Sequence, residues 1–212
     1  MSKKAERIAG RFRVERELGQ GAAATVYAVI DERLGVLRAL KRLSPAMTRY
    51  ARMRTRLVAE ARAMARLTHP HVVRVFDVFI DNDDACIVME LVEGGSVVSL
   101  LQQQGALPPK RAIGLMGEIL SALHAAHQAG IIHRDIKPAN ILVGGQNKNA
   151  KIADYGISRV ATLDATMTIK GTLVYQAPEL SRGERYGFAA DIFSLALTMY
   201  EVCDRVRVGC FC

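Results

Sequence analysis

The stretch that decides the fold is His133-Arg134-Asp135-Ile136-Lys137-Pro138-Ala139-Asn140. It sets a carboxylate, an ammonium and a carboxamide at fixed places within one short segment. Any tripeptide taken from it is common in proteins, but the whole string with its Asp, Lys and Asn is very specific. This specificity makes it the reference point for the weaker motifs on either side of it.

Two weaker motifs precede this stretch, and each has an ordinary structural alternative. In Gly19-Gln20-Gly21, a glycine turn lets backbone N–H groups approach phosphate oxygens, although most such turns are plain hairpins. In Arg38-Ala39-Leu40-Lys41, Lys41 is flanked by apolar residues on a β-prone segment, where it needs an ionic partner unless it points to water from an edge strand. Glu60 is the natural partner, and its alternative is a surface pair with Arg56.

Hydrophobic patterning divides the chain into a strand-rich front and a helix-rich back. Alternating and β-branched runs predict strands at 12–18, 25–30, 36–43, 72–80 and 85–92. Helix-forming composition and spacing predict helices at 50–67, 96–104, 109–128 and 189–202. The change of character at Gly94-Gly95 therefore predicts an α+β protein with two lobes.

The composition is that of a globular domain, with 212 residues, 50% hydrophobic and 24% charged. The net charge is +8, and a solvated helix face explains the arginine-rich stretch 33–66 better than nucleic acid, anionic lipid or an acidic substrate does. Trp is absent and aromatic residues make up 6%, so no nucleic-acid partner is expected. The four cysteines show no paired spacing and no apolar run could span a bilayer, which predicts a cytoplasmic protein.

Two motifs after the deciding stretch, Asp154-Tyr155-Gly156 and Ala177-Pro178-Glu179, complete a set of five. In this order the five motifs resemble the protein kinase family, and the resemblance covers nearly all of residues 12–201. Lys137 and Pro138 are similar to the Ser/Thr class, and the layout resembles bacterial kinases of the eukaryotic type. The resemblance implies a bilobal kinase fold that uses ATP to phosphorylate Ser and Thr hydroxyls of protein substrates, with autophosphorylation among its possible reactions.

The resemblance also assigns the catalytic roles. Phosphoryl transfer requires in-line positioning and compensation of the charge on the moving group, and little covalent chemistry from the protein. By resemblance, Asp135 accepts the proton of the substrate hydroxyl and Lys137 steadies the γ-phosphate. Lys41 holds the α- and β-phosphates of ATP and is itself aligned by Glu60.

The same resemblance implies a Mg²⁺ and a nucleotide site. Asp154 and Asn140 would bind Mg²⁺, since hard oxygen ligands suit that ion. Ser96 stands where many relatives place an acidic contact to the ribose, so that contact is weaker or remade here. The implied nucleotide-binding residues are Leu18, Gly19, Gly21, Val26, Ala39, Lys41, Met89, Glu90, Val92 and Leu142.

Several other polar and aromatic residues are interpreted as structural. By resemblance, His133 and Tyr155 stack in a column of side chains with Met64 above them. Asp191 anchors this column by bonding the backbone of the catalytic loop, and His127 is its buried partner rather than a catalytic base. Tyr155 replaces the usual Phe, so its hydroxyl needs a partner or a water molecule.

The segment between the last two motifs is the implied activation loop. Arg134 beside Asp135 implies that a phosphate on this loop pairs with the guanidinium and orders the segment. Thr166 and Thr168 are the candidate sites of autophosphorylation, and Thr172 is expected in the substrate platform.

The end of the chain departs from the family pattern. The expected layout is a tail at 1–11, an N-lobe at 12–93, a partial C-lobe at 94–202 and an atypical tail at 203–212. Kinase domains continue with further helices, so we expect a C-lobe that lacks its last helices, the result of a frameshift or an early stop. The apolar helix 189–202 would then be exposed and favour self-association. The alternative function is a truncated, catalytically impaired fragment that binds nucleotide or partners.

Overall fold

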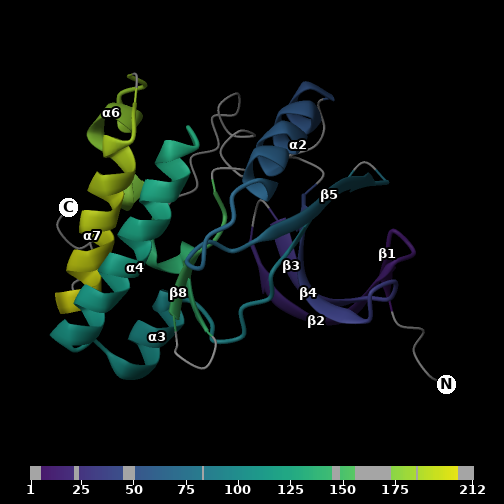
Figure 1. Ribbon diagram of the computed structural model, residues 1–212, viewed down its shortest axis with the longest axis horizontal. Coiled ribbons are helices and arrows are strands. Elements are labelled where there is room, and N and C mark those ends of the chain that lie inside the picture. Colours follow the sequence, from purple (N-terminus) through teal and green to yellow (C-terminus); the bar gives the residue numbers. More distant parts are fainter. Residues whose placement is uncertain are drawn as a thin grey trace. The chain divides into compact units, whose positions relative to one another are not determined.

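The computed structural model describes residues 6–21, 24–44, 51–82, 84–144, 149–155, 173–184 and 186–204 (Figure 1). These residues belong to two compact units. The first unit holds the described residues up to Arg66 together with Arg74–Leu91. The second holds Leu67–Val73 and the described residues from Val92 onward.

The described residues of the first unit form an antiparallel sheet and a helix. The strands follow the spatial order β1-β2-β3-β4-β6-β5, and the helix α2 (Ala51–Ala65) packs against β5 and β6 (Figure 1). The strands are β1 (Arg7–Ile8), β2 (Phe12–Gln20), β3 (Ala24–Asp31), β4 (Val36–Leu43), β5 (Val75–Asp81) and β6 (Asp84–Met89).

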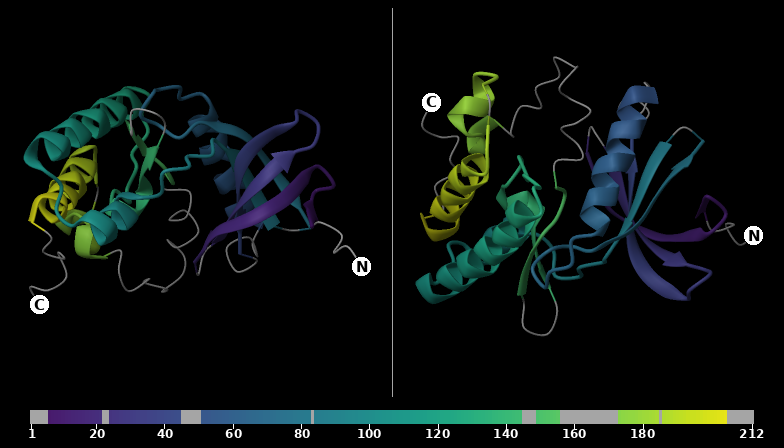
Figure 2. Two further views of the ribbon diagram at one scale, coloured as in Figure 1. Left: turned by 90° about the horizontal axis from the view of Figure 1, so that it is seen from below. Right: turned by 45° about the horizontal axis from the view of Figure 1, so that its top comes forward.

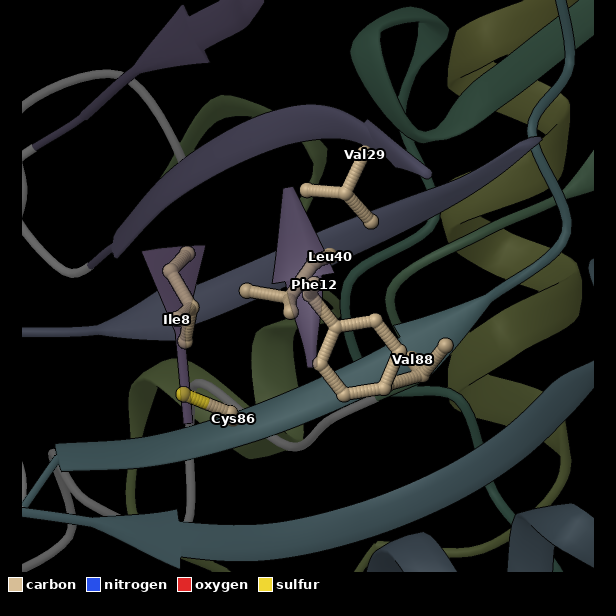
Figure 3. Packing of buried hydrophobic residues seen from close by; sticks show 6 residues of the cluster. All are labelled: Ile8, Phe12, Val29, Leu40, Cys86 and Val88. Atoms are coloured by element: carbon tan, nitrogen blue, oxygen red, sulfur yellow. The ribbon is translucent and has the colours of Figure 1, made fainter. Parts of the chain in front are cut away.

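One face of this sheet carries the core of the first unit. Side chains from five strands point toward one another there (Figure 3), and the rings of Phe12 and Phe79 stack with centroids 5.5 Å apart. Burial raises the pKa of the Cys86 thiol to about 12, so this cysteine packs as a small apolar residue. The buried cluster consists of Ile8, Phe12, Val29, Leu40, Cys86 and Val88.

Two features of this sheet differ from the sequence-based expectation. Residues 7 and 8, expected within a tail, form β1, because a turn with positive φ at Ala9 and Gly10 returns the chain and sets Ile8 opposite Phe12. The strand expected to end at Leu18 continues to Gln20, with Gly19 paired to Val26 after an irregularity in the ladder. Glycine weakens a strand but does not end it when the partner strand is in place.

The second unit is mainly helical (Figure 2). Its long helices α4 and α7 lie side by side, and α4 also packs against the hairpin strand β8. Buried residues of α4 recur at helical spacing, which is the amphipathic pattern that the sequence predicts. Its elements are α3 (Val97–Gln104), α4 (Pro109–Gln128), η1 (Pro138–Asn140), β7 (Ile141–Gly144), β8 (Asn149–Ile152), η2 (Leu173–Tyr175), α6 (Pro178–Ser181) and α7 (Ala189–Asp204).

The segment 67–73 belongs to the second unit, although the sequence predicts a strand from residue 72 onward. Its backbone pairs with Ile152, whose carbonyl accepts from the N–H of Val73 at 2.8 Å and whose N–H donates to His71 at 2.9 Å. The ring of His71 lies 2.9 Å from the carbonyl oxygen of Ala150. His69 and His71 are therefore packing and turn residues, as expected.

Gly94 is required by a close backbone approach within the second unit. A Cβ atom at Gly94 would lie 1.7 Å from the carbonyl oxygen of Val143, which no real contact allows. Gly95 has a φ of +83°, and its carbonyl accepts from the N–H of Val143 at 2.8 Å. The two glycines thus let the chain run directly along β7, which explains the change of character at this point.

Two surface observations complete the fold. On α7, Ile192 and Tyr200 are each 45% exposed, so the described part of this helix shows large side chains to solvent, as expected for this helix without further helices to cover it. Across the described residues, no helix combines the length and the hydropathy that crossing a membrane would require.

Candidate active site

A buried carboxylate organises the loop of the deciding stretch. Asp191, at the start of α7, is fully buried and accepts from the backbone N–H groups of His133 at 2.8 Å and Arg134 at 2.7 Å. The Nε2 of His127, on α4, lies 2.8 Å from the same carboxylate and donates to it. The anchoring role of Asp191 and its pairing with His127 are therefore confirmed, with the His127 side chain 14% exposed rather than fully buried.

His133 joins this loop to the segment that carries Asp154. Its Nε2 donates to the carbonyl oxygen of Ala153 at 2.9 Å, and its Nδ1 accepts from the N–H of Asp135 at 3.2 Å. This arrangement requires a neutral ring with the proton on Nε2. Complete burial lowers the pKa of His133, so the neutral form is also the one that the surroundings favour.

Asp135 lies in a cluster of three polar side chains, two of which hold the same oxygen. The Nδ2 of Asn140 donates to the Oδ2 of Asp135 at 2.8 Å and to its carbonyl oxygen at 2.7 Å. The Nζ of Lys137 lies 2.8 Å from the same Oδ2. Pro138 opens the turn η1 between them, and the N–H of Asn140 closes it on the carbonyl of Lys137 at 3.0 Å. The loop sequence therefore brings its carboxylate, ammonium and carboxamide together.

Asp154 comes directly after Ala153, whose backbone connects the segment of Asp154 to the loop that carries Asp135. The N–H of Ala153 donates to the carbonyl oxygen of Asn140 at 2.8 Å, and Asp154 then adopts a φ of +60°. Such a conformation is uncommon outside glycine, and it clusters at functional sites where neighbouring contacts enforce it. Arg134 shows the same feature with a φ of +69°.

The donor set of this region suits Mg²⁺. Both bonds of Asn140 to Asp135 use its Nδ2, so its amide oxygen is the atom left to act as a ligand, beside the carboxylate of Asp154. No group of three His, Cys, Asp or Glu residues able to hold a metal exists within the described ranges. A cation that keeps water ligands and takes phosphate oxygens fits this pair, and Mg²⁺ has that character.

Tyr155 stacks as the sequence predicts, and its hydroxyl has an unusual environment. Its ring centroid lies 4.5 Å from that of His133 at an angle of 52°. The hydroxyl is buried without a hydrogen-bond partner among the residues that the structure describes. Burial raises the pKa of Tyr155, and the negative charge of Asp191 adds to the effect. Met64 belongs to the first unit, so its place above this column stays a prediction.

In the first unit, the register of the sheet brings several expected nucleotide contacts together. Val26 on β3 pairs with Gly19 on one side and with Lys41 on the other. Ala39 lies two residues before Lys41, on the same face of β4, and pairs with Met89 on β6. These residues therefore occupy adjacent positions on the neighbouring strands β2, β3, β4 and β6.

Further expected site residues of the first unit are Leu18, Gly21, Lys41 and Glu60. Lys41 is 5% exposed, and a lysine buried to this extent is expected to have an ionic partner. Glu60 is a half-buried residue of α2. The Lys41–Glu60 pair stays a prediction. Leu18 is 38% exposed on β2, and Gly21 donates its N–H to the carbonyl of Ala24 at 2.9 Å.

In the segment after β6, one backbone group of Glu90 is used within the fold and the other is a candidate for contacting the base of a nucleotide. The N–H of Glu90 donates to the carbonyl of Arg74 at 2.9 Å, so only the carbonyl oxygen of Glu90 suits a contact to a base. In the second unit, Val92 contacts the backbone at Gly144, and Leu142 on β7 forms a bridge with Ser96.

Ser96 has a role that sequence reasoning missed. Its hydroxyl accepts from the N–H of Ser99 at 3.3 Å, while the hydroxyl of Ser99 accepts from the N–H of Ser96 at 3.2 Å. This reciprocal capping box begins α3. It engages the side chain of Ser96, the residue that stands where many relatives place an acidic contact to the ribose. The signal was present in the sequence as a Ser three residues before a second Ser at the start of an apolar helix.

Some expected residues fall outside the described ranges. These are the candidate phosphorylation sites Thr166 and Thr168, Thr172 of the expected substrate platform, and Gly156. Residues 22 and 23 of the glycine turn and the cysteines Cys210 and Cys212 are also outside them.

Comparison with known proteins gives one consistent result. A family model described as the protein kinase domain matches residues 12–208. The serine/threonine-protein kinase PknD of Mycobacterium tuberculosis is 39% identical over 91% of this chain and 29% of its own length. PknL of the same species is 36% identical over 91% of this chain and 49% of its own length. The chain thus spans about half or less of the length of these relatives.

Solved structures agree. The kinase domain of Mycobacterium tuberculosis PknI matches with a TM-score of 0.80 and 31% identity, over 99% of this chain and 81% of that one. A structure of Rad53 1–466 in complex with AMP-PNP matches with a TM-score of 0.76 and 31% identity, over 92% of this chain and 48% of that one. The predicted α+β kinase fold, with a β-rich unit and a helical unit, is confirmed.

The lowered pKa of His133 predicts a pH-dependent stability. The folded state resists protonating this ring, whereas the unfolded chain takes up the proton near pH 6.5. The free energy of unfolding should therefore fall as the pH drops below about 6.5, by up to about 1.4 kcal/mol per pH unit for this residue. Urea unfolding between pH 7.5 and 5.5 measures the slope, which His133→Asn should reduce.

The exposed His124 on α4 provides the matched control. His124→Asn should leave the slope unchanged, and His69, whose pKa burial also lowers, accounts for part of the slope that remains in both variants. Equal slopes in His133→Asn and in the unmodified protein would contradict the assignment.

Proposed function

Because the chain belongs to the protein kinase family, we propose that it transfers the γ-phosphoryl group of ATP to Ser and Thr hydroxyls of protein substrates. The observation that carries this proposal is the cluster of Asp135, Lys137 and Asn140. Its residue types supply the proton acceptor, the cation and the metal ligand that phosphoryl transfer needs. The relatives' names support the Ser/Thr class, and the deciding stretch is similar to that class.

Asp135 is the proposed acceptor of the substrate's hydroxyl proton. Asn140 and Lys137 both hold its Oδ2, which fixes the plane of the carboxylate and leaves Oδ1 as the oxygen oriented for this role. The side chain of Lys137 is 21% exposed while its ammonium is held by Asp135, so we propose that the ammonium can also meet a phosphate group. Its charge would offset the negative charge that the transferred group carries.

Asn140, through its amide oxygen, and Asp154, through its carboxylate, are the proposed ligands of Mg²⁺. When bound, the ion would supply positive charge next to the phosphate oxygens. The chain's own contribution is to hold the two ligands in place, through the Asn140–Asp135 bonds and the bond between Ala153 and Asn140.

In the first unit, the proposed phosphate contacts are Lys41, aligned by Glu60, and the backbone of the glycine turn around Gly19 and Gly21. The pairing of Val26 with both Gly19 and Lys41 supports this, because it places Lys41 on the strand next to the one that follows the glycine turn. The remaining residues proposed to contact the nucleotide are Leu18, Ala39, Met89, Glu90, Val92 and Leu142.

The partners beyond ATP remain proposals. A protein that presents a Ser or Thr is the proposed substrate, and no nucleic acid is expected. The exposed apolar side chains of α7 support self-association as a further prediction, and sedimentation at increasing protein concentration measures it. A cytoplasmic location is likewise a prediction, which fractionation of cells that make the protein would measure.

The central experiment is transfer of labelled phosphate from ATP in the presence of Mg²⁺. Asp135→Asn keeps the size of the side chain but removes the proton acceptor, so kcat should fall by about 10²–10⁴-fold. Asp204→Asn, at the exposed end of α7, is the matched control and should leave kcat unchanged. An Asp135→Asn protein that keeps a tenth or more of the activity would sink the assignment.

The same experiment separates the alternative function. If ATP raises the melting temperature of the unmodified protein but no phosphate is transferred, the chain is an impaired nucleotide-binding fragment. In that case Lys41→Ala should abolish the thermal shift.

We also propose that Thr166 or Thr168 is autophosphorylated. Arg134 supports this, because its guanidinium belongs to the loop that carries Asp135 and suits a phosphate. Mass spectrometry of active protein should show about 80 Da added to the peptide that holds both residues, a mass set by the phosphoryl group itself. An active sample with both threonines unmodified would rule the proposal out.

A further inference from the structure

A short segment before α7 places two aromatic rings on two polar residues of the second unit. The guanidinium carbon of Arg134 lies 5.0 Å from the ring centroid of Tyr186. The ring of Phe188 stacks on that of His127, with centroids 4.5 Å apart and an angle of 24° between the planes. One residue, Gly187, separates the two aromatic residues. We call Tyr186, Gly187 and Phe188 the aromatic segment.

Both residues that the aromatic segment covers are attached to the same carboxylate. Arg134 donates its backbone N–H to Asp191 at 2.7 Å, and His127 donates from Nε2 at 2.8 Å. Tyr186 and Phe188 therefore contact the two neighbours of Asp191 that come from different elements, the loop and α4.

The backbone of Arg134 needs such support. Its φ of +69° is unfavourable for a side chain with a Cβ, and residues keep such conformations only where the surroundings enforce them. The bond to Asp191 fixes the backbone end of Arg134, and the ring of Tyr186 fixes the guanidinium end. A cation over an aromatic face is attractive, and the effect requires the ring itself rather than any apolar side chain.

We propose that Tyr186 and Phe188 are positioning residues for the loop that carries Asp135. They act through Arg134 and His127 on the carboxylate of Asp191 and contact neither nucleotide nor substrate. The inference rests on the proposed kinase function for its effect on rate, while its structural part is independent of that function.

Plain surface packing is the competing explanation, because Phe188 is 45% exposed. The two explanations predict different effects of substitution. Packing tolerates a leucine of similar bulk, whereas a ring-dependent contact does not. Tyr186→Phe keeps the ring and removes only the hydroxyl, and Tyr186→Leu removes the ring. Tyr200→Leu, on the exposed surface of α7, is the matched control for loss of a tyrosine ring.

The first measurement is amide hydrogen exchange at His133 and Arg134, whose N–H groups both bond to Asp191. Tyr186→Leu should speed exchange at Arg134 by about threefold to tenfold, the range expected for losing one cation–ring contact. Phe188→Leu should speed it at His133 and Arg134 to a similar extent. Tyr186→Phe and Tyr200→Leu should keep the original rates. Unchanged exchange in Tyr186→Leu, or equally fast exchange in Tyr186→Phe, would overturn the proposal.

The second measurement is the rate of phosphate transfer. Tyr186→Leu should lower kcat by about threefold to tenfold with little change in the KM for ATP, since the ring positions the loop and not the nucleotide. In an Arg134→Ala background, Tyr186→Leu should add no further loss. Faster exchange with an unchanged kcat would reduce the contact to packing and overturn the positioning role. If the unmodified protein transfers no phosphate, the kinase proposal fails, and the exchange rates alone test whether Tyr186 and Phe188 position the loop.

Discussion

The hydrogen bonds of one buried carboxylate, that of Asp191, are the constraint on which the loop carrying Asp135 depends. It satisfies two consecutive backbone N–H groups that lie away from solvent, and each would cost about 1–3 kcal/mol if left without an acceptor. Because these N–H groups belong to His133 and Arg134, the position of the next residue, Asp135, is set by the same bonds. Asp191 thus links the packing inside the helical unit to the position of Asp135, the proposed proton acceptor.

Two further hydrogen bonds connect the loop held by Asp191 to the segment that carries Asp154. The ring of His133 donates to the carbonyl oxygen of Ala153, and the N–H of Ala153 donates to the carbonyl oxygen of Asn140. Ala153 directly precedes Asp154. Each step pairs a buried polar group, so the loop is held by the general requirement that such groups be hydrogen-bonded. The side chains proposed to do chemistry are therefore attached to a backbone that is hydrogen-bonded at His133, Arg134 and Asn140.

Much of this could be predicted from the sequence because the relevant signals are local. The Asp, Lys and Asn of the loop all lie within residues 135–140, so a short segment with one proline is enough to bring them together. The strands and the long helices follow from periodicity, and the register of β3 with β4 then brings Val26 to Lys41. The role of Asp191 also came from the family pattern, since nothing in its own helix marks it as an anchor.

The features that escaped prediction depend on partners far apart in the sequence or on details of backbone geometry. Tyr186 contacts Arg134, and Phe188 contacts His127, across separations that no local pattern reveals. The strand β1 forms because a turn at Ala9 and Gly10 allows it, although two residues are too few to show a period. The buried hydroxyl of Tyr155 was foreseen as a need for a partner, and the described residues supply none.

The most direct test of this account is the kcat of Asp191→Asn, measured beside the dissociation constant for ATP. Asn keeps the shape of Asp191 but turns one of its acceptor oxygens into a donor that faces a backbone N–H. We expect a kcat at least tenfold lower, with ATP binding within about threefold of the original, because the loop loses its support and the nucleotide site does not. A kcat within twofold of the unmodified protein, in a variant that remains folded, would contradict it.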